Sequence, residues 1–280
     1  MTTVPAGPRT NERTVRGAPD RRGVSMPRVL SAEWTKLTSV RSNAWLALGT
    51  VVAAAGTAHA LGLFVRPGDG RSGSWVVTSG FVLAQLGFLV LGALVGAGEY
   101  TTGTARTTFA TVPRRLPVLA AQVLVTAAAA FAVALVALGA SVLATAPARS
   151  GDAPALDLSV PGASRALLGF AVACVAVALL GTGLGALLRR PADALVVGVL
   201  LTSVGDHVLA ANPGLVTDTV RAFLPSSGAR LVQDDAALAA LDATTLGPRL
   251  GAWGGGGVAA AWVVVVLVAA AYRLRRHDVR

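Results

Sequence analysis

The chain contains a single cysteine and a single lysine, and each scarcity excludes a class of chemistry. Cys174 lies inside an apolar block, so no disulfide can form within the chain and no thiolate metal site is expected. The phosphate-binding loop of ATP-hydrolysing proteins requires a lysine after a Gly-rich turn, whereas Lys36 lies in the sequence Trp-Thr-Lys-Leu. The three histidines are isolated from one another, and the zinc-peptidase pattern H-E-x-x-H is absent. We therefore expect no catalytic residue, no metal and no cofactor bound by this chain.

Charged residues are also scarce, at 14% of 280 residues, whereas a soluble domain carries about 25%. Apolar residues make up 54%, and the mean hydropathy is +0.64. They gather in six blocks, each long enough to cross the roughly 30 Å hydrocarbon core of a bilayer as a helix. The blocks cover Trp45–Val65, Trp75–Ala97, Val118–Ala146, Ala166–Leu188, Ala192–Leu209 and Trp253–Tyr272. The sequence predicts an all-α polytopic membrane protein with six transmembrane helices.

Four parts follow from this pattern. Residues 1–26 are rich in Arg, Gly and Pro and lack hydrophobic periodicity, so we expect a disordered cytoplasmic tail. Residues 27–42 are expected to form an interfacial helix, residues 43–272 the transmembrane domain, and residues 273–280 a basic cytoplasmic tail.

The segment 27–42 is amphipathic when drawn as a helix. Its apolar residues fall within roughly 140° of one another, which suits a helix lying in the headgroup layer with Trp34 on the apolar side. Glu33 falls inside the apolar arc, and Lys36 one turn later could neutralise it. The alternative is that the segment merely extends the first span.

The basic residues are distributed unequally between the two sides of the membrane. A net charge of +10 could indicate nucleic-acid binding, but the basic residues lie between the apolar blocks rather than on one face. With six spans, 17 Lys and Arg fall on the side of the termini and 7 on the other. The positive-inside rule therefore predicts that both termini are cytoplasmic. We expect a plasma-membrane protein with no nucleic-acid partner.

Two connecting segments have distinctive patterns. The inner loop Glu99–Pro117 contains a helix signal from Thr102 to Pro113, with Arg106 and Phe109 one turn apart. This is either a docking surface for another protein or a solvated loop. The outer loop Asn212–Pro248 is either a structured cap or a flexible loop, with a short helix predicted over Ala236–Leu241 after two aspartates.

A few polar residues and glycines lie within or at the ends of the apolar spans. Asp206 and His207 lie near the outer end of the fifth span, where they either line a translocation path or are simply hydrated at the interface. Small residues four apart, at Gly92 and Gly96 and at Gly181 and Gly185, favour close helix packing within the bundle. The run Gly254–Gly257 weakens the start of the sixth helix.

Several stretches, in this order among six spans, resemble the permease subunits of type-2 ATP-binding-cassette transporters, particularly the actinobacterial members. The stretches are Ser31–Leu37, Ser39–Ser42, Gly98–Arg106, Val112–Ala121, Phe223–Ser226 and Leu274–Val279. The chain departs from the family at Gln122, where relatives commonly carry lysine, and in its long N-terminal tail.

The resemblance implies a mechanism and partners. Residues 27–42, with Glu33, Trp34 and Lys36, would be an elbow helix, and Thr102–Val112 a coupling helix that receives motion from a separate ATP-binding subunit. The residues that would serve this coupling are Glu99, Gly103, Thr104, Arg106, Phe109, Pro113 and Arg114. A second permease copy, identical or related, and membrane lipid complete the expected partners, and the substrate would be exported. The rival interpretations are a membrane scaffold that transports nothing and an ion-coupled carrier that uses Asp206 and His207.

Overall fold

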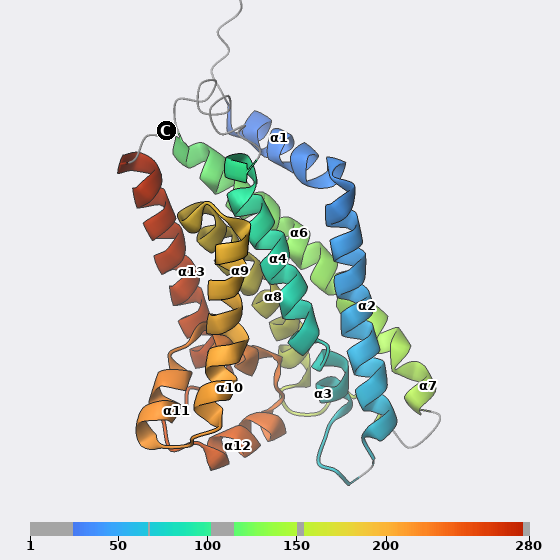
Figure 1. Cartoon of the computed structure of the whole chain (residues 1–280). Coiled ribbons are helices and arrows are strands. Elements are labelled where there is room, and N and C mark those ends of the chain that lie inside the picture. The colour runs from blue at the N-terminus through green and yellow to red at the C-terminus, as the bar shows by residue number, and fades with distance from the viewer. Residues whose placement is uncertain (1–24, 67, 102–114, 150–153, 277–280) are drawn as a thin grey trace, which may run out of the picture.

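The computed structural model describes residues 25–66, 68–101, 115–149 and 154–276. Within these ranges the chain forms helices and no strand, so the predicted all-α class is confirmed. The helices form one bundle in which helix α1 and the end of helix α13 lie at the same end (Figure 1). The structure therefore places the start and the end of the described chain on one side.

Six helical segments are long and apolar enough to cross a membrane, as the sequence predicts. They are α2 (Arg41–Phe64), α3 with α4 (Gly73–Thr78 and Phe81–Thr101), α6 (Arg115–Ala144), α8 (Ala163–Leu188), α9 with η1 and α10 (Pro191–Val199, Leu200–Val204 and Gly205–Ala210) and α13 (Gly251–Arg276). A short helix, α7 (Ala146–Arg149), follows α6 after a turn at Thr145. Residues 273–276 of the predicted basic tail are thus helical, and residues 277–280 lie outside the described residues.

Helix α8 lies at the centre of the bundle, and its glycines bring it against α4. A Cβ added to Gly92 would overlap the carbonyl oxygen of Ala178, and one added to Gly181 would lie 2.5 Å from the carbonyl oxygen of Leu89. In lipid, where no hydrophobic effect drives association, such close backbone approach is a main source of helix–helix attraction. The prediction that the small residues pack one bundle tightly is confirmed.

The second span is broken, which the sequence analysis did not predict. Helix α3 ends at Thr78 and α4 begins at Phe81, with a turn at Ser79 and Gly80 between them. A Cβ at Gly80 would overlap the backbone of Ala54 in α2, so α2 crosses the break at very short range. The absence of a side chain at Gly80 permits this contact.

Helix α1 (Met26–Ser39) is a separate helix and not a straight extension of α2 (Figure 1). Val40 between them has extended backbone angles, and Asn43 Nδ2 donates to the carbonyl of Leu37 at 2.9 Å. The buried Val29 packs on Val118 and Ala121 of α6. Residues 1–24 of the predicted tail lie outside the described residues.

The charged pair predicted on α1 is present. Glu33 is buried, and Lys36 Nζ lies 2.6 Å from its Oε1. Trp34 remains exposed on the surface of the helix. The carboxylate of Glu33 is tolerated on the packed side of α1 because it forms an ion pair with Lys36, one helical turn away.

The long segment between the fifth and sixth spans forms a structured cap, defined here as α11 (Leu215–Ala222), η2 (Pro225–Val232) and α12 (Asp235–Thr244). Helix α12 begins where Asp234 Oδ1 accepts from the amide of Ala237 at 2.8 Å, and it extends beyond the predicted range on both sides. Asp234 Oδ2 also accepts from the hydroxyls of Ser72 and Ser74, which precede and begin α3. The cap is thus tied to the end of the second span.

The glycine run at the start of α13 does not interrupt that helix. Helix α13 runs without a break from Gly251, and a Cβ at Gly255 would overlap the carbonyl oxygen of Ser227 in η2. The expected weakness is therefore offset by packing, because the glycines let the cap lie directly on the helix backbone.

Candidate functional site at the cap end of the fifth span

The fifth span changes its helical geometry halfway. Helix α9 gives way to a π-helical turn, η1, in which the amide of Gly205 donates to the carbonyl of Leu200 five residues earlier. Thr202 Oγ1 donates to the carbonyl of Gly198 at 2.9 Å, and Ser203 Oγ is buried with no hydrogen-bond partner. Single π turns inside α-helices frequently mark functional sites. The turn shifts the register of α10 and so sets which of its side chains faces the cap.

A polar cavity of about 510 Å³ lies between α10 and the cap. Ligand pockets commonly measure about 300–1,000 Å³, so this cavity has room for a small molecule. Its lining includes four charged side chains and several hydroxyls and amides. The charged ones are Asp206, Asp218, Arg221 and Arg230.

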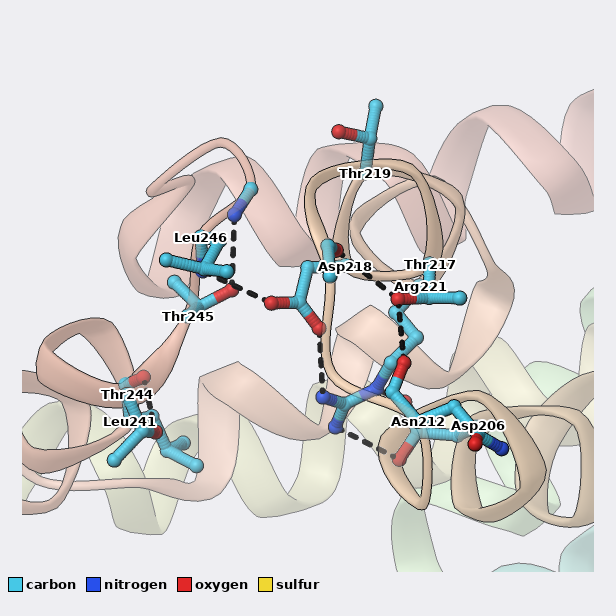
Figure 2. Close-up of polar contacts among 12 residues, drawn as sticks. Asp206, Asn212, Thr217, Asp218, Thr219, Arg221, Leu241, Thr244, Thr245 and Leu246 are labelled. Carbon is cyan, nitrogen blue, oxygen red and sulfur yellow. Dashed lines mark hydrogen bonds and ion pairs between the residues drawn. The ribbon is translucent and has the colours of Figure 1, made fainter.

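The Arg221 guanidinium is held between two carboxylates (Figure 2). Its Nε and Nη2 donate to the two carboxylate oxygens of Asp206 at 3.2 and 3.4 Å. Its Nη1 lies 3.7 Å from Oδ1 of the buried Asp218. Asp218 Oδ2 accepts from the amide of Leu246 at 2.9 Å, and Ser226 Oγ donates to Asp206 at 3.4 Å. These contacts join α10, α11, η2 and the segment after α12.

A second ion pair fixes the other side of the cavity. Arg230 Nη1 in η2 lies 2.7 Å from Asp242 Oδ1 in α12, and both side chains are largely covered. The lining charges therefore include two acidic and two basic groups, each paired within the protein. Such a surface can bind a neutral polar or zwitterionic group by exchanging partners within its ion pairs.

An apolar crevice adjoins the polar cavity. Ser226 and Ala229 line both, and the crevice continues between Phe81 of α4, Val177 of α8 and Val263 of α13. Its volume is about 20 Å³, which is close to the space of one water molecule. The crevice between the polar cavity and the bundle therefore has room for little more than one water molecule.

The two residues predicted to line a path have different positions. Asp206 lines the cavity, whereas His207 is exposed and is not part of the lining. His207 Nδ1 instead lies 2.8 Å from the carbonyl oxygen of Ser203. The two side chains diverge because neighbouring residues of a helix point about 100° apart.

Sequence reasoning missed the partners of Asp206. Arg221 and Arg230 entered the analysis only as charges counted for orientation, and Asp218 was not considered. The spacing of Asp218 and Arg221, three residues apart, is a signal for a pair on one helix face. No local pattern could have joined Asp206 to Arg221, because that contact depends on how α10 and α11 fold back on each other.

Most of the predicted coupling residues cannot be placed in the same way. Glu99 falls within α4. Gly103, Thr104, Arg106, Phe109, Pro113 and Arg114 lie outside the described residues. Within residues 25–66, 68–101, 115–149 and 154–276, no cluster of three His, Cys, Asp or Glu side chains could hold a metal ion.

No protein-family model matches this chain, and no curated protein matches it.

Proposed function

We propose that this chain is the permease subunit of an ATP-driven exporter, which moves a substrate outward through the plasma membrane. A separate cytoplasmic ATP-binding subunit would supply the energy, and a second permease copy, identical or related, would complete a twelve-span path. Both termini would face the cytoplasm, as the distribution of Lys and Arg favours.

One observation carries this proposal: a polar cavity with paired charges lies at the end of the fifth span, beyond its π turn, and adjoins a narrow apolar crevice between α4, α8 and α13. A scaffold protein does not need a polar cavity that leads toward the bundle, whereas a transporter needs a polar site whose access to the bundle differs between two states. The π turn of η1 and the break between α3 and α4 provide positions where helices can change packing.

Two further features support the proposal. The single lysine excludes a Walker-type ATP site in this chain, so an ATP-driven permease must use a partner's ATPase. The separate helix α1 packs on the inner end of α6, where the resemblance places an elbow helix. The resemblance also assigns the loop containing Arg106 and Phe109 to the contact with the ATPase.

The arrangement favours this function over an ion-coupled carrier. A carrier that uses Asp206 and His207 as a proton-linked pair would bring the two side chains together. In the structure Asp206 is paired with Arg221, and His207 bonds to a backbone carbonyl.

Co-purification tests the proposal directly. The full chain is extracted in mild detergent, the proteins that accompany it are identified, and their ATPase activity is measured. We expect an ATP-binding subunit to be retained, and its recovery to fall at least about tenfold in the double variant R106A/F109A, because aromatic and Arg side chains dominate docking contacts. The matched control is R249A, which removes an exposed charge at the other end of the bundle.

Two outcomes contradict the proposal. Transport driven by an ion gradient without ATP, and abolished by D206N, would identify an ion-coupled carrier. Recovery of partners that lack ATPase activity, with equal retention in wild type and R106A/F109A, would favour a scaffold.

A further inference from the structure

The end of the bundle opposite the cavity contains a guanidinium group without an acceptor. Arg189 directly follows α8, and its Nε and Nη2 are buried with no hydrogen-bond partner. The group lies over the ring of Tyr100, with its carbon 5.1 Å from the ring centroid. Buried donors nearly always find acceptors in native proteins, because an unmade hydrogen bond is unfavourable. The position of the Arg189 side chain therefore lowers the stability of the fold.

The backbone of Arg189 is unfavourable as well. Its φ of 62° and ψ of 11° are left-handed, and its amide closes α8 by donating to the carbonyl of Gly185 at 2.8 Å. Glycine is the usual residue at such a helix end, because a side chain is strained there. Among the described residues, Arg189 is the only non-glycine with positive φ. An arginine at this position is disfavoured both by its backbone and by its unpaired donors.

Other arginines gather at the same end. Arg190 is exposed beside it, and Arg273 Nη1 donates to the carbonyl of Leu187 in the last turn of α8. In the described part of the chain, none of Arg189, Arg190 and Arg273 forms an ion pair with a carboxylate. Within the described residues, this cluster of three arginines is thus a concentration of positive charge without a carboxylate partner.

The cluster lies at the level of a lipid headgroup layer. The apolar cluster of Leu119, Ala186, Ala270 and Leu274 ends just below it, with Tyr100 packed against that cluster. Tyrosines at the ends of apolar spans mark the membrane interface, and Tyr272 lies at the same end of α13. The anion most abundant at this depth is the phosphate of a phospholipid.

We propose that Arg189, with Arg190 and Arg273, binds the phosphate of an anionic phospholipid headgroup. A guanidinium offers two parallel N–H donors that match phosphate oxygens, and Arg190 and Arg273 add positive charge at the same end of α8. Arg189 is half-buried, and in this proposal its terminal torsions rotate on binding so that the buried donors reach the phosphate. The bound phosphate would supply the acceptors that the protein does not, which accounts for arginine in a position that favours glycine. This inference does not depend on the proposed transport function.

The test is lipid-dependent thermal stability of the full chain in mixed micelles, followed by tryptophan fluorescence. Replacing part of the phosphatidylcholine by phosphatidylglycerol should raise the unfolding midpoint of the wild type by about 2–4 °C. R189Q should lose most of that rise, and R249Q, an exposed change at the opposite end, should retain it. R189G should unfold at a higher midpoint than wild type in phosphatidylcholine alone, yet gain nothing from phosphatidylglycerol.

Each other outcome overturns the proposal. An equal rise in R189Q and wild type would show that Arg189 does not bind the lipid. An equal rise when inorganic phosphate is added to phosphatidylcholine micelles would show a site for free anions rather than for a headgroup. A wild type that is indifferent to phosphatidylglycerol would leave the three arginines to another partner, such as the carboxylates of a second protein.

Discussion

Replacing Asp234 by alanine should detach the cap from the second span. One carboxylate oxygen of Asp234 caps α12 through the amide of Ala237, and the other accepts from the hydroxyls of Ser72 and Ser74. Ser72 in turn caps α3 by accepting from the amide of Trp75 at 3.0 Å. A single buried side chain therefore connects the starts of two helices that lie about 160 residues apart in the sequence.

The expected loss can be worked out from these contacts. Removing an N-cap side chain costs about 1 kcal/mol, and leaving a buried hydroxyl without its acceptor costs about 1–2 kcal/mol. Ser72 and Ser74 still bond to each other at 2.8 Å, which limits the second term. The free energy of opening the cap should fall by about 2–3 kcal/mol, which corresponds to roughly 30- to 140-fold faster exchange of the α12 amides when exchange follows local opening.

Hydrogen exchange of the full chain in detergent measures this rate. The matched control is D235A, which removes an ion pair to Arg165 at 2.6 Å next to the same helix start. Asp235 is 57% exposed, so its loss should change exchange by no more than about fivefold. D234N should exchange at a rate between wild type and D234A, because asparagine also caps helices but its nitrogen cannot accept from Ser72 and Ser74. If D234A and D235A exchange equally fast, the buried carboxylate does not connect the cap to the span.

Two further predictions concern the bundle and the cavity. G92A should destabilise the chain by about 1–3 kcal/mol in thermal unfolding, because the added methyl group meets a backbone carbonyl of α8. The control G139A, on an open face of α6, should stabilise it by up to about 1 kcal/mol. Equal effects of the two substitutions on stability would contradict the close approach of α4 and α8. In a double-mutant cycle of unfolding, R221Q and D206N should show a coupling free energy of about 1 kcal/mol. The value is small because both side chains are 30% exposed and solvent partly screens the pair. A coupling of zero would mean that the ion pair is not formed in solution.

The sequence predicted the spans well because that signal is local. Each span requires about 20 apolar residues, and the loss of charge over that length is visible without knowledge of any contact. The pair of Glu33 and Lys36 was predictable for the same reason, since residues three apart on a helix are always neighbours. The helix that follows Asp234 was predictable from its capping residue.

The break at Gly80 and the π turn of η1 were not predictable in this way. A glycine within an apolar run is compatible with a continuous helix, and only the crossing of α2 at Ala54 shows why the chain turns there. A π turn depends on how the last turns of a span meet their neighbours, so the residues Leu200–Val204 look like any other part of the fifth block.

By itself, then, the sequence determined that this chain is a six-span helical membrane protein, because hydropathy is a property of the chain alone. Only the tertiary structure decided what the polar residues do. It separated Asp206 from His207, paired Asp206 with Arg221 beside the cap, and left Nε and Nη2 of Arg189 without an acceptor among the described residues at the other end. Those outcomes depend on how distant helices meet, and the distances between side chains on different helices are set by packing rather than by order along the chain.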